Sequence, residues 1–239
     1  MFRRIFILLI VAALVAAGAL FVWLRSTAPK AGALDVLQNG DLVFQTRISL
    51  SDMSVAFMTL SPLTHVGIIK NSANAAPRVV DVSDKVQEMP LSGWLEHGAG
   101  DRVVVKRMRG MTPAIAANIL ESARAYYGKP DDLLFRFDAD SIYSGELVYA
   151  AFQSGARINL GRVQRMLELN VDNVFVQKFF AMHWRDHPLC QTPESNIYTV
   201  CADLILSQEI ITPVSIATAP QLDTVYDNYG WLATLIGKH

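Results

Sequence analysis

The chain has 239 residues, of which 51% are hydrophobic, and 21 basic and 22 acidic side chains give it a formal net charge of −1. This length suits one domain of ordinary size. Because the charges are nearly balanced, the sequence carries no electrostatic footprint for a nucleic acid, and we expect no such partner.

The N-terminal segment, residues 1–30, differs from the rest of the chain. After two arginines, an uninterrupted apolar run extends from residue 5 to residue 24, and about 20 such residues span a bilayer core. We predict an uncleaved, single-pass transmembrane helix here, with a signal peptide cleaved near residues 17–19 as the alternative. Because the arginines favour a cytoplasmic N-terminus, we expect an inner-membrane protein whose main domain, residues 31–239, is periplasmic.

Short strands are predicted in the first half of that domain. Apolar segments separated by turn residues indicate four of them: Asp41–Phe44, His65–Lys70, Arg78–Asp84 and Arg102–Met108. Short strands that follow one another in this way favour a mostly antiparallel sheet.

Helices are predicted after the strands. Thr112 as a cap, Pro113 at the first helical position and Gly128 at the far end delimit one helix. Residues 144–154 and 173–184 have apolar faces and predict two more. Beyond Cys201 the pattern predicts little. Strands followed by helices on one side of the sheet indicate an α+β fold.

Three short motifs follow one another in the domain: "NGDLVF" from residue 39, "THVGII" from residue 64 and "YSGELVYAAF" from residue 143. In this order they resemble the permuted papain-like hydrolases of the NlpC/P60 superfamily, the YiiX/YebB-like group. The resemblance covers residues 37–152 and, more weakly, residues 211–227. It implies a circularly permuted papain-like fold and hydrolysis of an amide or ester bond in a cell-wall peptide, or in an acylated small molecule or lipid.

The resemblance also implies catalytic residues. His65 falls on the family's catalytic histidine, and Asp81 falls near its acidic partner, with Asp84 as the nearest alternative. Ser144 falls on the nucleophilic cysteine. A serine hydroxyl, unlike a thiolate, must lose its proton to histidine as it attacks, so we expect a hydrogen bond between Ser144 and His65.

Each of these residues has a simpler structural explanation. Ser144 suits a helix cap, His65 suits a strand edge and Asp81 suits a turn. If the site is active, the backbone N–H of Ser144 would stabilise the oxyanion, with Tyr143 assisting it and Glu146 lying beside the site. The alternatives to an enzyme are an inactive binding module that lacks the family's thiol and a structural envelope protein.

The remaining candidate groups lie between residues 183 and 201. In an exported domain, Cys190 and Cys201 are close enough in sequence to form a disulfide, and two buried thiols are the alternative. His183 and His187 would share one face of a helix, a spacing that can bind zinc. However, Trp184 stands where the zinc-protease pattern requires glutamate, so we predict no metal and no cofactor.

The anchor prediction is tested by washing membranes with high salt. The full-length protein should stay with the membrane fraction, because an apolar span is not held there by charge. Removal of residues 1–30 should release the domain into the soluble fraction. Release of the full-length chain by salt would contradict the prediction.

Overall fold

The structure, a computed structural model, describes residues 34–73, 75–137 and 140–230. The predicted anchor at residues 5–24 lies outside these ranges. Within them, no helix combines the length and apolar character needed to cross a membrane.

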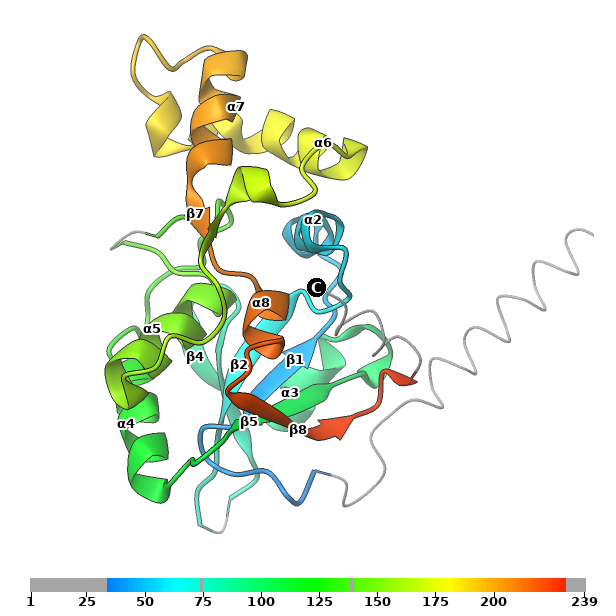
Figure 1. Cartoon of the computed structure of the whole chain (residues 1–239), viewed down its shortest axis with the longest axis vertical. Helices are drawn as coiled ribbons and strands as arrows, with labels where there is room; N and C mark the ends of the chain where they lie inside the picture. The colour runs from blue at the N-terminus through cyan, green and yellow to red at the C-terminus, as the bar shows by residue number, and fades with distance from the viewer. Residues whose placement is uncertain (1–33, 74, 138–139, 231–239) are drawn as a thin grey trace, which may run out of the picture.

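A six-stranded sheet forms the centre of the domain, in the order β4-β3-β2-β1-β5-β8 (Figure 1). Every pair of neighbours is antiparallel, which confirms the predicted type of sheet. The strands are β1 (Leu42–Gln45), β2 (His65–Lys70), β3 (Arg78–Val82), β4 (Val86–Pro90), β5 (Val104–Met108) and β8 (Leu222–Asp227). The sequence patterns did not indicate β4 or β8, although β8 extends the sheet beside β5.

Helices connect and cover these strands. They are α2 (Leu50–Thr59), α3 (Leu91–Glu96), α4 (Pro113–Arg124), α5 (Ser144–Ala156), α6 (Val174–His183), α7 (Tyr198–Ser207) and α8 (Pro213–Ala217). The hydroxyl of Thr112 accepts the N–H of Ile115 at 3.2 Å and caps α4 as predicted. The sequence analysis missed α2, α3, α7 and α8.

The sheet has a packed core on each face. Val66 and Ile68 of β2 point into the larger core, which also contains Leu147 and Val148 of α5. Ile69 points to the opposite face, where Trp94 of α3 is completely buried. The expectation that helices cover one side only was therefore wrong, because α3 closes the second face.

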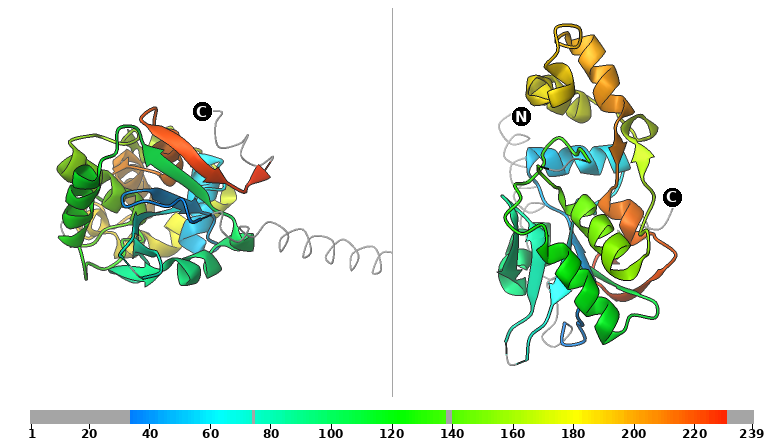
Figure 2. Two further views of the ribbon diagram at one scale, coloured as in Figure 1. Left: turned by 90° about the horizontal axis from the view of Figure 1, so that it is seen from below. Right: turned by 90° about the vertical axis from the view of Figure 1, so that its left-hand side faces the viewer.

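Residues 166–208 form a helical lobe that projects from one end of the domain (Figures 1 and 2). Its ends are joined where β6 (Gln164–Arg165) pairs antiparallel with β7 (Glu209–Ile210). The lobe rests on the body through α6, since Phe175 stacks on Phe57 of α2 with ring centroids 4.1 Å apart. The lobe is thus connected to the body both at α2 and through the β6–β7 pair.

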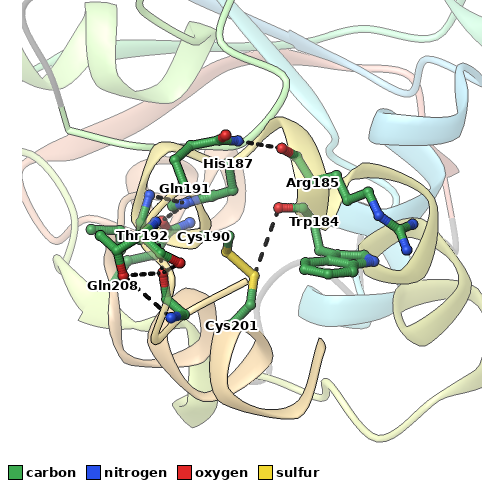
Figure 3. Close-up of a disulfide and its surroundings, with 10 residues drawn as sticks. Trp184, Arg185, His187, Cys190, Gln191, Thr192, Cys201 and Gln208 are labelled. Carbon is green, nitrogen blue, oxygen red and sulfur yellow. Dashed lines mark hydrogen bonds between the residues drawn. A yellow bond between two sulfur atoms is a disulfide. The ribbon is translucent and has the colours of Figure 1, made fainter. Parts of the chain in front are cut away.

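A disulfide joins Cys190 to Cys201 inside the lobe (Figure 3). Both residues are almost fully buried, and their Cα atoms lie 5.2 Å apart. The bridge ties the 3-10 turn Pro188–Cys190 to α7.

The bridge leads to a measurable prediction. Unfolding the unreduced protein should expose no thiol to alkylation, whereas reduction should expose two. A Cys190→Ser, Cys201→Ser double variant should lower the free energy of unfolding by about 3 kcal/mol, the usual contribution of a short closed loop. Two labelled thiols without reduction would rule out the bridge.

Candidate active site

His65 and Asp81 come together from neighbouring strands. Nε2 of His65 lies 2.6 Å from Oδ1 of Asp81, within hydrogen-bond distance. The side chain of His65 is 9% exposed and that of Asp81 is fully buried. The structure thus pairs His65 with Asp81, while Asp84 follows β3 in the turn and lines the adjacent cavity.

The other oxygen of Asp81 is also bonded. Its Oδ2 accepts hydrogen bonds from Arg47 at 2.9 Å and from Ser83 at 3.0 Å. Burial by itself would raise the pKa of Asp81, but the charge and hydrogen bond of His65, followed by those of Arg47, lower this pKa to about 2. Asp81 is therefore an ionised acceptor at neutral pH, so Nε2 of His65 carries the proton of their hydrogen bond. In the neutral ring, Nδ1 is then the free acceptor.

Gly67, which has no side chain, lies next to the His65–Asp81 pair. A Cβ atom at Gly67 would lie 2.4 Å from Val79 Cγ1 and 3.6 Å from Asp81 Oδ1. Contacts below about 3 Å are not tolerated without movement of the chain. The glycine of the "THVGII" motif thus lets β2 and β3 pack closely where the His65–Asp81 pair is held.

Ser144 is the first residue of α5, and Tyr143 is the helix cap. No side-chain hydrogen bond caps this helix, so the structure does not support the simple explanation of Ser144 as a cap. Two contacts with Ile211 fix the position. The Tyr143 hydroxyl accepts the N–H of Ile211 at 3.0 Å, and a Cβ at Gly145 would lie 2.5 Å from the Ile211 carbonyl oxygen.

Tyr143 and Glu146, which the sequence analysis named together with Ser144, are both buried. Burial raises the pKa of Tyr143 well above its ordinary value, although the hydrogen bond from Ile211 acts in the opposite direction. The phenol is therefore neutral at physiological pH. Glu146 lies in the first turn of α5.

Ser144 and His65 line the same cavity, which has a volume of about 340 Å³. The rest of its wall includes Arg47, Asp52, Asp84, His97, Asp131 and Asp132. In the part of the chain that the structure describes, no hydrogen bond joins the Ser144 hydroxyl to the His65 ring, so the bond expected from the sequence is not formed here. Catalytic hydrogen bonds in ligand-free enzymes are commonly long and tighten only with substrate.

A larger cavity of about 530 Å³ lies beside α8 and is lined by Thr212, which also lines the smaller one. Its wall contains neither His65 nor Ser144. The smaller cavity is therefore the candidate active site. A well-formed cavity at His65 also argues against a purely structural envelope protein.

The two lobe histidines do not share a helix face. α6 ends at His183, and His187 has extended backbone angles. Both ring nitrogens of His187 are bonded, Nε2 to Gln208 at 3.0 Å and Nδ1 to the Leu189 N–H at 3.2 Å. The expectation of a shared helix face was wrong because the helix stops one turn earlier.

A His–Asp pair on strands that precede helix α5 in the chain, on an antiparallel α+β fold, is the arrangement expected of a permuted papain-like hydrolase. The comparison with protein families agrees. The family "Permuted papain-like amidase enzyme, YaeF/YiiX, C92 family" matches residues 36–226. The chain belongs to this family of hydrolases, and the match also includes β8, the strand that the sequence motifs did not reveal.

Two relatives illustrate the similarity. The chain is 26% identical to "Uncharacterized protein YiiX" of Escherichia coli K12 over 190 residues, covering 79% of this chain and 85% of that protein. A crystal structure of YiiX from Escherichia coli O157:H7 has a TM-score of 0.69 and 26% identity, covering 80% of this chain and 97% of that one. The fold described above is therefore similar to a solved one.

The solved YiiX structure is described as a metalloprotein. In the described ranges of the present chain, no group of three or more His, Cys, Asp or Glu side chains is arranged to hold a metal ion. The described residues therefore do not provide such a site, and no step below is derived through a metal.

The acidic wall of the cavity generates a pH prediction. Burial, followed by the charges of Asp132, Asp52 and Asp81, raises the pKa of Asp131 to about 7. Because the carboxyl group of an unfolded chain ionises near 3.8, the folded state binds this proton more tightly. The resulting stabilisation is complete below about pH 4 and is lost as the pH rises through about 7.

Asp131→Asn removes that proton equilibrium. The melting temperature of the variant should rise relative to the parent by roughly 5 °C between pH 5 and pH 8, a change discounted for the partly exposed position. Thermal unfolding followed by circular dichroism measures it. Asp84→Asn, on the same wall, is the matched control. A parent–variant difference that stays constant with pH would contradict the prediction.

Proposed function

We propose that the protein hydrolyses an amide or ester bond through an acyl-enzyme on Ser144. One observation carries this proposal. His65 Nε2 forms a 2.6 Å hydrogen bond with Asp81, and His65 and Ser144 line the same cavity. Because Nε2 is occupied by this hydrogen bond, Nδ1 is the ring nitrogen that can accept the serine proton. Ser144 stands at the start of α5, where backbone N–H groups lack intrahelical partners.

The reaction follows from these positions. Ser144 Oγ attacks the carbonyl carbon while its proton moves to Nδ1 of His65, and the imidazolium then donates that proton to the leaving amine or alcohol. Water repeats the sequence to release the acid. Asp81 stays ionised and holds the ring, since its pKa of about 2 lies far below neutral pH. The backbone N–H of Ser144 would bind the oxyanion.

The substrate classes are a cell-wall peptide or an acylated small molecule or lipid, in keeping with the amidase family. We also propose that residues 5–24 anchor the protein in the inner membrane with its domain in the periplasm. In that place the site would meet both cell-wall and lipid substrates.

The second candidate function is a binding module that has kept the cavity without turnover. The observation that favours it is the absence of a direct Ser144–His65 hydrogen bond in the described residues. A papain-like site normally activates a thiol, which ionises far more readily than a hydroxyl. A serine without close contact to its base would be a weak nucleophile.

Labelling with a fluorophosphonate, which captures activated serines, separates the two functions. The parent should label at one residue, Ser144, and both Ser144→Ala and His65→Ala should lose at least about 90% of the labelling, because neither retains an activated hydroxyl. Asp84→Asn, which changes the cavity wall without touching the His65–Asp81 pair, should label like the parent.

A parent that does not label would favour the binding module. In that case Ser144→Cys tests whether the site is still electrostatically competent. Beside His65 and the start of α5, the new thiol should react with iodoacetamide well below pH 8, and a further His65→Ala change should remove most of that reactivity. An unreactive thiol would end the catalytic proposal.

A further inference from the structure

We propose that Asp52 is a second positioning residue for His65, one that stabilises the positive ring formed when Ser144 gives up its proton. No sequence motif pointed to Asp52. The inference rests on the proposed function for its catalytic meaning. The charge interaction between Asp52 and His65, on which the inference is based, exists whether or not the protein turns over a substrate.

The geometry places Asp52 on the reactive side of the ring. Its Oδ1 lies 4.0 Å from His65 Nδ1, the nitrogen that Asp81 leaves free, and its side chain is 14% exposed in the wall of the cavity. At 4.0 Å the two groups are too far apart for a hydrogen bond. They are near enough for a charge–charge interaction when the ring is positive.

The start of α2 holds Asp52 in this position. Ser49 caps the helix, and its hydroxyl accepts the N–H of Asp52 at 3.1 Å. The same hydroxyl donates to Oδ2 of Asp52. One carboxylate oxygen is thus committed to the helix cap, so the other faces the ring.

The two carboxylates have different effects on His65. Asp81 forms a hydrogen bond with Nε2 and fixes the orientation of the ring. Asp52 stands away from Nδ1, which leaves that nitrogen able to accept a proton from the nucleophile. The attraction between Asp52 and His65 becomes full only when the ring turns positive, so it favours the transition state over the resting enzyme.

Other charged and titratable groups also face this cavity and must be separated from Asp52. They are Arg47 after β1, Asp84 after β3, His97 after α3, Asp131 and Asp132 between α4 and α5, and Tyr143 before α5. Arg47 is already bonded to Asp81. A variant of another carboxylate on the same wall is therefore the proper control.

The experiment measures fluorophosphonate labelling of Ser144 against pH. In this step the Oγ–P bond forms, the P–F bond breaks, fluoride leaves and the serine proton moves to Nδ1. Asp52→Asn preserves the shape of the side chain but removes its charge. The maximal rate should fall about tenfold, and the half-maximal rate on the acid side should move about half a pH unit lower, because the ring is then easier to deprotonate.

Asp84→Asn should change neither quantity by more than about twofold or 0.2 pH unit, and Asp52→Glu should restore part of the rate. A simple loss of packing would lower the rate without moving the acid limb. An unchanged acid limb and rate in Asp52→Asn, with a parent-like melting temperature, would overturn the proposal.

A probe-free measurement separates this inference from the proposed function. The pH titration of the His65 ring signals is followed by NMR in the parent and in Asp52→Asn. A lower midpoint in the variant supports the coupling even if the parent never labels, in which case only the hydrolase proposal fails. Equal midpoints overturn the assignment of Asp52 whether or not labelling occurs.

Discussion

The hydrogen bond between His65 and Asp81 is the contact on which the site depends. A fully buried carboxylate is costly unless it is paired, and here it receives hydrogen bonds from His65, Arg47 and Ser83. These partners come from β2, from the chain after β1 and from the chain after β3. The site therefore forms only when the central strands pair in register. The pairing of the central strands therefore determines both the fold and the geometry of the candidate site.

A second constraint fixes the serine side of the site. The start of α5 is pressed against Ile211, with a glycine where a side chain would not fit and a tyrosine hydroxyl on the Ile211 N–H. Ile211 directly follows β7, one of the two strands that close the helical lobe. The C-terminal segment thus forms the wall of the cavity before it returns to the sheet as β8. The family match likewise continues to residue 226, well past the motif that contains Ser144.

The sequence predicted the parts of the fold that have strong local signals. An apolar segment bounded by turn residues identified β5, and a cap with a following proline identified α4. By contrast, only one residue of β8 is buried, and the strand is held by pairing with β5, a contact distant in sequence. Helix α3 has no side-chain cap bond and begins directly after β4. Tertiary packing, which no local pattern encodes, decides both elements.

The same distinction applies to the site. His65, Asp81 and Ser144 lie in or near motifs that resemble those of a known family, so the sequence alone predicted them as candidate site residues. Arg47 and Asp52 follow β1 with no motif of their own, and the sequence analysis overlooked them. A lone arginine and an aspartate in the first turn of a helix are normal at such positions. Because β1 lies beside β2, the chain that follows β1 brings Arg47 to Asp81 and Asp52 to within 4.0 Å of the His65 ring.

The chemistry of a hydroxyl nucleophile gives this arrangement its meaning. A thiolate site needs a positive histidine at rest, whereas a serine site needs a neutral ring that turns positive only as the bond forms. A carboxylate bonded directly to Nδ1 would block the proton that serine must deliver. At 4.0 Å, Asp52 leaves the nitrogen open. Asp81, on the far side of the ring, keeps the tautomer that makes Nδ1 an acceptor. In our proposal, this division of roles between two carboxylates allows Ser144 to act where the family resemblance places a cysteine.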